Sequence, residues 1–181
     1  GWPCADTAYS LIRVYPGLIP EFEYVSACAG ELVSFYDSST SQFSSISVWS
    51  WGFGDNSTAS VQNPQHAYST GGNYSVSLTV YNGNGCLKTI TKNVFVFPVP
   101  MTEFDHTQAC EGDSILFTDK TTLSSGFPVF WSWNFNNESV SNQQNTSYLF
   151  QTTGNYTVTL EVYSNYGCAD TISKSIQVLP M

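Results

Sequence analysis

The sequence predicts an all-β protein made of two similar antiparallel sandwiches placed in series. Apolar and aromatic residues alternate with polar residues in short runs, and no run has a helical period. Clusters of Asp, Asn, Ser and Gly separate these runs about every 8–12 residues, which is typical of sandwiches. The pattern also repeats: Cys110 follows Cys28 by 82 positions, and Cys168 follows Cys86 by the same interval.

The strand with the strongest signal occupies residues 49–55, with the sequence WSWGFGD. Its three large aromatic residues alternate with small ones, so they share one face of an extended segment. Gly54, Asp55 and Asn56 then favour a tight turn. The same strand returns at residues 131–137. We expect these eight residues in the two cores: Trp49, Trp51, Phe53, Tyr74, Trp131, Trp133, Phe135 and Tyr156.

The other strands of the first repeat follow the same rule of alternation. Val33 and Phe35 share a face, residues 74–80 (YSVSLTV) alternate with a clean period of two, and residues 90–96 supply a last strand. We expect the apolar face of residues 76–80 to oppose the aromatic face of residues 49–53.

The repeat divides the chain into domains. We expect residues 17–98 to form the first domain, residues 99–181 to form the second, and residues 1–16 to be the C-terminal strand or strands of a preceding repeat of a longer protein. Short proline-containing joints stiffen the connections, which predicts an elongated rod. Phe95 and Phe97 lie near a joint, where they either contact the next domain or are partly buried within their own.

Composition excludes several classes of function. The formal net charge is −9 and no cluster of Lys or Arg exists, so we expect no nucleic-acid binding. No apolar run is long enough to cross a bilayer, so we expect no membrane insertion. Only 10% of the residues are charged, so the polar surface must consist largely of Ser, Thr, Asn, Gln and Gly.

The five cysteines indicate disulfides and therefore export to an oxidising compartment. The repeat suggests one bond inside each domain, Cys28–Cys86 and Cys110–Cys168, with Cys4 bonded to a missing upstream repeat. Zinc binding is disfavoured because no two cysteines are close in sequence.

The stretches WSWGFGD, NPQHAY (residues 63–68) and GGNYSVSLTV (residues 71–80) resemble the signature of the PKD domain, which implies an immunoglobulin-like sandwich. The second repeat keeps WSW and GNYTVTLEV but has Asn136 and Asn137 for Gly-Asp and Tyr148 for His66. The cysteine contexts CAGE and GNGC are similar to tandem PKD repeats of very large surface proteins of Bacteroidetes-type bacteria. Several of those are adhesins or gliding-motility proteins exported by the type IX secretion system.

Few residues are candidates for chemistry. Asp55 and Asn56 could supply oxygens to calcium, although capping of the turn is the favoured interpretation, and no other cofactor is expected. Asp37 and Asp119 precede Ser and Thr residues and are expected to make local turn hydrogen bonds. His66 is expected to be structural, and no nucleophile–base arrangement is readable, so we expect no enzyme.

These features favour a non-enzymatic, extracellular segment of a large bacterial surface protein, acting as a rigid, disulfide-stabilised spacer or adhesion module. Its expected partners are neighbouring repeats of the same chain and surface glycans or proteins. One alternative is an accessory module of a secreted hydrolase that binds polysaccharide or protein substrate through exposed aromatics such as Phe43, Tyr81 and Tyr163. Another is a subunit of an extracellular filament joined through the first segment and Cys4.

Overall fold

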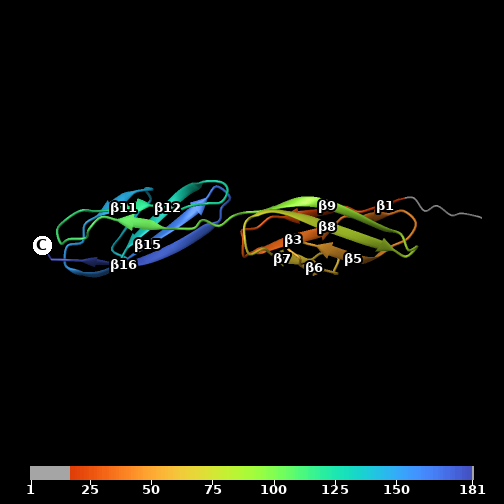
Figure 1. Ribbon diagram of the computed structural model, residues 1–181, viewed down its shortest axis with the longest axis horizontal. Coiled ribbons are helices and arrows are strands. Elements are labelled where there is room, and N and C mark those ends of the chain that lie inside the picture. The colour runs from red at the N-terminus through yellow and green to blue at the C-terminus, as the bar shows by residue number, and fades with distance from the viewer. Residues whose placement is uncertain (1–16, 181) are drawn as a thin grey trace, which may run out of the picture.

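The computed structural model describes residues 17–180 as two β-sandwiches placed end to end (Figure 1). Strand β1 (Leu18–Ile19) lies at one end of the particle and the C-terminus lies at the other. The described residues include no helix long and apolar enough to cross a membrane. The predicted strands of a preceding repeat at residues 1–16, and Cys4 with them, lie outside the described residues.

The first sandwich packs a three-stranded sheet, ordered β2-β3-β7, against a four-stranded sheet, ordered β6-β5-β8-β9. The short pair β1-β4 completes it, and all pairings between these strands are antiparallel. Its remaining strands are β2 (Phe22–Val25), β3 (Leu32–Asp37), β4 (Thr40–Ser41), β5 (Ile46–Gly52), β6 (Thr58–Ala59), β7 (Gln65–Ala67), β8 (Gly72–Asn82) and β9 (Leu87–Val96).

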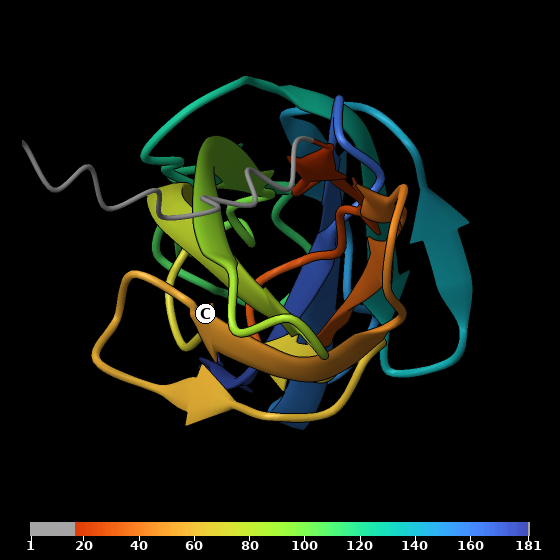
Figure 2. The same ribbon diagram turned by 90° about the vertical axis from the view of Figure 1, so that its right-hand side faces the viewer.

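The second sandwich repeats this arrangement with sheets ordered β10-β11-β14 and β13-β12-β15-β16. The counterpart of the β1-β4 pair is a single antiparallel bridge between Met101 and Thr122. Figure 2 shows the two sandwiches along the long axis of the particle. The strands are β10 (Phe104–His106), β11 (Ile115–Asp119), β12 (Pro128–Phe135), β13 (Ser139–Ser141), β14 (Thr146–Tyr148), β15 (Gly154–Ser164) and β16 (Ala169–Val178).

Each sandwich has its own aromatic core, as the alternation in the sequence predicts. Trp51 pairs with Leu78 across β5 and β8 and is almost fully buried, and Trp133 pairs with Leu160 across β12 and β15. The aromatic strand thus lies beside the Val-Leu-Val strand in one sheet, and the predicted opposition is met residue by residue, Trp49 against Val80 and Trp51 against Leu78. Phe53 and Phe135 are also buried, whereas four of the expected core residues are only partly buried and pack against the core: Trp49, Tyr74, Trp131 and Tyr156.

The turn after the aromatic strand explains why glycine and asparagine occur there. Gly54 has φ +84°, and a Cβ at this position would lie 2.8 Å from the carbonyl oxygen of Ser75. Asn56 has φ 73°, and in the second repeat Asn136 and Asn137 have φ 53° and 62°. Asn tolerates this left-handed region better than most residues, so the second repeat makes its turn with Asn.

The predicted disulfide pairs Cys28–Cys86 and Cys110–Cys168 are wrong. The structure joins Cys28 to Cys168, and Cys86 and Cys110 are free thiols. Cys28 pairs with Phe97, just beyond the end of β9, whereas Cys86 lies in the turn between β8 and β9 at the opposite end of the sandwich. A strand of 11 residues such as β8 spans roughly 30 Å, far more than the roughly 7 Å between Cα atoms that a disulfide tolerates.

Candidate functional site

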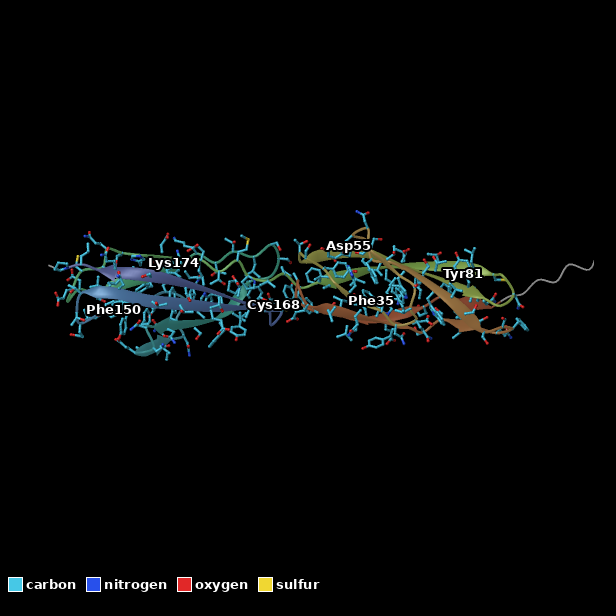
Figure 3. All side chains as sticks on the ribbon, turned by 90° about the horizontal axis from the view of Figure 1, so that it is seen from below. Phe35, Asp55, Tyr81, Phe150, Cys168 and Lys174 are labelled. Atoms are coloured by element: carbon cyan, nitrogen blue, oxygen red, sulfur yellow. A yellow bond between two sulfur atoms is a disulfide. The ribbon has the colours of Figure 1, made fainter. Side chains whose placement is uncertain are left out.

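The site with the most specific construction is the junction between the two sandwiches, where Cys28 of the first meets Cys168 of the second. The Cα atoms of this pair are 5.8 Å apart although 140 positions separate them in sequence. Figure 3 shows Cys168 midway along the particle, beside the end of the first sandwich. The bond therefore joins two domains that are already connected by the linker.

Backbone hydrogen bonds hold both cysteines in place. On the first sandwich, the N–H of Ala29 donates to the carbonyl of Phe97 at 2.8 Å, which fixes the segment that carries Cys28. On the second, the N–H of Ser164 donates to the carbonyl of Cys168 at 2.8 Å and closes the β15-β16 turn. Gly167 in this turn has φ +82°, a conformation that favours glycine.

An aromatic cluster accompanies the disulfide. The ring of Tyr166 stacks on Phe97 with centroids 5.2 Å apart and contacts Phe95 edge-on at 5.5 Å. Of the two alternatives for Phe95 and Phe97, the structure therefore shows the contact with the next domain. Sequence reasoning missed Tyr166, because its counterpart in the first repeat is Asn84 and the repeat gave no hint of an aromatic residue there.

The linker between the sandwiches is pinned at both ends. Pro98 is buried against Gly71, where a Cβ would lie only 2.4 Å from the Cα of Pro98, so the close approach requires glycine. On the other side, the N–H of Thr102 donates to Asp170 Oδ2 at 2.9 Å and its hydroxyl donates to the carbonyl of Asp170 at 3.1 Å. These contacts restrict the freedom of the linker.

Asp55, a candidate calcium ligand, forms a compact hydrogen-bonded cluster with Ser57 and His66. His66 Nε2 lies 2.7 Å from Asp55 Oδ2 and 3.3 Å from Ser57 Oγ, and Ser57 Oγ also donates to Asp55. Partial burial raises the pKa of Asp55, but hydrogen bonds from Ser57 and His66 outweigh it and lower the pKa to about 2. Ser57 and Asp55 both contact Nε2 of His66. In a catalytic triad, the serine contacts one imidazole nitrogen and the carboxylate contacts the other.

The imidazole of His66 has a packing role. It stacks on Phe53 with centroids 4.4 Å apart and meets Tyr68 edge-on at 4.6 Å. In the second repeat, Tyr148 occupies this place, stacks on Phe135 at 4.6 Å and donates its hydroxyl to Glu138 at 3.3 Å. Either ring fills the position, which agrees with a structural histidine.

Metal ligands do not gather elsewhere in the described chain. Within residues 17–180, no group of three or more His, Cys, Asp and Glu side chains is arranged to hold a metal ion. Asn56, the other calcium candidate, adopts the left-handed conformation of the turn.

Asp37 and Asp119 make the predicted turn hydrogen bonds and one further contact that sequence reasoning missed. Asp37 Oδ1 accepts from the N–H of Ser39 at 3.0 Å, and Oδ2 accepts from Trp49 Nε1 at 2.7 Å. Asp119 accepts from Trp131 Nε1 at 2.8 Å in the same way. The signal was present, because an Asp precedes the first Trp of the aromatic strand by 12 positions in both repeats.

These features define a class of protein: tandem immunoglobulin-like sandwich modules with a built joint. The chain belongs to the PKD domain family, whose model matches it twice, at residues 19–97 and at residues 96–179. PKD domains are typically extracellular modules of secreted bacterial proteins and are generally non-catalytic. A disulfide agrees with such a location.

Solved structures give further similarities. The PKD1 domain of Vibrio anguillarum Epp is 27% identical, with a TM-score of 0.44, and the match covers 47% of this chain and 99% of that domain. The PKD1 domain of the Vibrio cholerae metalloprotease PrtV is also 27% identical, with a TM-score of 0.42, covering 45% of this chain and 99% of that domain. A structure from work on host cell surface retention of a 1.5-MDa bacterial ice-binding adhesin is 12% identical over 92% of this chain and 66% of that one, with a TM-score of 0.50.

Proposed function

We propose that the chain is a non-enzymatic extracellular segment of a large bacterial cell-surface protein, in which stapled PKD domains act as a rigid spacer. Such a segment holds a distal part of the protein away from the cell. The resemblance of its cysteine contexts to repeats of adhesins and gliding proteins makes adhesion or gliding, with export by the type IX system, the specific form of this proposal.

The single observation that supports a spacer is the Cys28–Cys168 bond across the joint. A single peptide linker leaves a hinge, and domains on such a linker are expected to move relative to each other. A second covalent connection, held by the same two backbone segments that carry the Tyr166–Phe97 stack, opposes bending. Stiffness along the rod is what a spacer needs.

Small-angle scattering tests this function. A single compact globule of 181 residues would have a radius of gyration of about 16 Å. With the Cys28–Cys168 bond formed, and at low protein concentration without added oxidant so that the chain stays monomeric, we expect a clearly larger value and the narrow distance distribution of a rod. The double variant Cys28→Ser/Cys168→Ser should broaden the distribution, whereas Cys86→Ser, which removes a free thiol, should leave it unchanged. A compact particle, or equal flexibility with and without the bond, would contradict the proposal.

Exposed aromatic residues favour polysaccharide binding as a second candidate function. Tyr81 is 37% exposed and Phe43 is 55% exposed, while Tyr163 packs edge-on against Phe130, which is 42% exposed. Rings on a sheet surface can stack on sugars. Loss of binding to a glycan array in Tyr81→Ala or Phe130→Ala, with Val140→Ala as an exposed apolar control, would support this candidate; no glycan binding by the wild-type chain would exclude it.

A further inference from the structure

We propose that Cys110 and Cys86 form disulfides of the kind that Cys28 and Cys168 form here, each with a further repeat. Cys110 takes the part of Cys28 at one end of the unit, and Cys86 takes the part of Cys168 at the other. In the isolated chain, the partner is a second copy of the chain, with Cys110 of one copy bonded to Cys86 of the next. The inference deepens the proposed spacer function and rests on it for its biological use, but the bond itself is argued from geometry.

Cys110 has the same backbone setting as the bonded Cys28. Cys28 forms a parallel bridge with Phe97, and Cys110 forms a parallel bridge with Leu179. The N–H of the next residue, Ala29 or Glu111, donates to the bridge partner's carbonyl at 2.8 Å in both cases. The far end of the second sandwich therefore presents Cys110 as the first sandwich presents Cys28.

Cys86 likewise has the setting of the bonded Cys168. The N–H of Asn82 donates to the carbonyl of Cys86 at 3.1 Å, as that of Ser164 donates to Cys168 at 2.8 Å. Gly85, just before Cys86, has φ +77°, close to the +82° of Gly167. Cys168 is only 2% exposed at the junction with the first sandwich, whereas Cys86 is partly exposed.

The two free thiols lie at opposite ends of the particle. Cys86 follows β8, and Figure 3 shows Tyr81, near the end of that strand, toward the end away from Cys168. Cys110 pairs with Leu179 near the C-terminus, which Figure 1 places at the other end. They therefore cannot bond to each other within one chain. If a following unit is placed on the second sandwich as the second sandwich is placed on the first, its Cys86 lies against Cys110. Repetition gives a head-to-tail series.

The new joint would rely on the covalent bond more than the observed one does. At the equivalent positions, Asn84 replaces Tyr166 and Leu179 replaces Phe97, so the ring stack is absent there. Leu179 is 41% exposed and is available as the apolar contact. Reduced chains should thus stay monomeric, and oxidised chains should be linked.

The bond forms by thiol–disulfide exchange with a low-molecular-weight disulfide such as oxidised glutathione. The Cys110 thiolate attacks one sulfur of glutathione disulfide, forms a mixed disulfide and releases one glutathione thiolate. The Cys86 thiolate of the next copy then attacks the Cys110 sulfur and releases the second glutathione. Two protein thiols are oxidised to one disulfide and one glutathione disulfide is reduced to two glutathione thiols. The two protons lost by the cysteines end on these glutathione thiols.

The test uses the full chain with Cys4→Ser, so that Cys86 and Cys110 are the remaining free thiols. At high protein concentration with oxidised glutathione, we expect a ladder of oligomers on a non-reducing gel that reduction collapses to monomer. Peptide mass spectrometry should find Cys86 joined to Cys110. Adding Cys86→Ser or Cys110→Ser should abolish the ladder, and mixing these two variants should give dimers only. Monomers that carry only glutathione adducts, or symmetric 86–86 and 110–110 dimers in the single variants, would overturn the proposal.

A second chain removes the dependence on concentration. This three-repeat protein carries a second copy of residues 99–181 directly after Pro180, which keeps the 82-residue spacing of the repeats. We expect Cys110 to bond the third repeat's copy of Cys168, because tethering raises the effective concentration to about the millimolar range. A folded three-repeat chain in which that pair stays reduced would refute the inference. The scattering result on the two-repeat rod is independent, so failure of one proposal is distinguishable from failure of the other.

Discussion

The ring of Tyr166 lies parallel to that of Phe97, with 4° between their planes and 5.2 Å between their centroids, although the two residues belong to different sandwiches. Tyr166 lies in the turn that also carries Cys168, and Phe97 forms the bridge with Cys28. The stack and the disulfide are thus held by the same two backbone segments. We therefore expect the stack and the disulfide to stabilise the joint together.

Replacing Tyr166 by Asn, the residue at the equivalent position of the first repeat, should weaken the joint. Aromatic pairs contribute about 0.5–1.5 kcal/mol beyond their buried area, so we expect a loss of this size. It should be measured as the free energy of urea unfolding in the Cys28→Ser/Cys168→Ser background, where the bond cannot mask it. Tyr36→Ala, at an exposed tyrosine of the first sandwich, is the control and should change little. Equal effects of the two substitutions would mean that the stack does not couple the domains.

Loss of the inter-domain disulfide should lower stability more than loss of a free thiol. Disulfides typically contribute about 2–4 kcal/mol, and this one closes a long loop. Cys28→Ser/Cys168→Ser should therefore lower the calorimetric melting temperature in the absence of reductant, and addition of reductant should cause no further loss. Cys86→Ser serves as the control. If Cys86→Ser destabilises as much as the double variant, the pairing described here is incorrect.

Asp37 and Asp119, which accept hydrogen bonds from Trp49 and Trp131, should stabilise their respective domains against unfolding. Asp37→Ala leaves Trp49 Nε1 and the turn N–H of Ser39 without their acceptor, which costs about 1–3 kcal/mol for a buried group and less where water replaces it. We expect unfolding of the first domain at lower urea concentration, and Asp119→Ala should have the same effect on the second. The exposed Asp105 offers a control through Asp105→Ala. A neutral result for Asp37→Ala would show that solvent fully replaces the contact.

The fold was predictable because the information is local. Alternation of Trp49, Trp51 and Phe53 determines which face is buried, and the Gly-Asp-Asn turn determines where the strand ends. The all-β tandem architecture is confirmed by the two sandwiches and by the family match. The partial burial of Trp49 was not predictable, because alternation gives the face of a strand but not its distance from the edge of the core.

The predicted disulfide pairing was wrong for a geometric reason. The repeat identifies equivalent cysteines but cannot say whether bonds lie within or between repeats, since both patterns have the same period. The lengths of β8 and β15, 11 residues each, decide the matter by separating the two cysteines of one repeat. The repeat also gave no prediction of the role of Tyr166. Its contact with Phe97 depends on a difference between the two repeats, since the first has Asn84 at the equivalent position.

The pH dependence of stability should carry the signature of Asp55. Its pKa in the folded chain is about 2, below the unfolded value of about 3.9, so the deprotonated form is favoured by folding. The resulting stability is fully present above pH ~4 and is lost as the pH falls through ~2. Because the side chain is partly solvent-accessible, we expect no more than about 1 kcal/mol after solvent screening. Urea titrations of the wild type and Asp55→Asn should converge toward pH 2 and diverge above pH 4. Asp105→Asn is the matched control, and parallel curves for wild type and Asp55→Asn would contradict the depressed pKa.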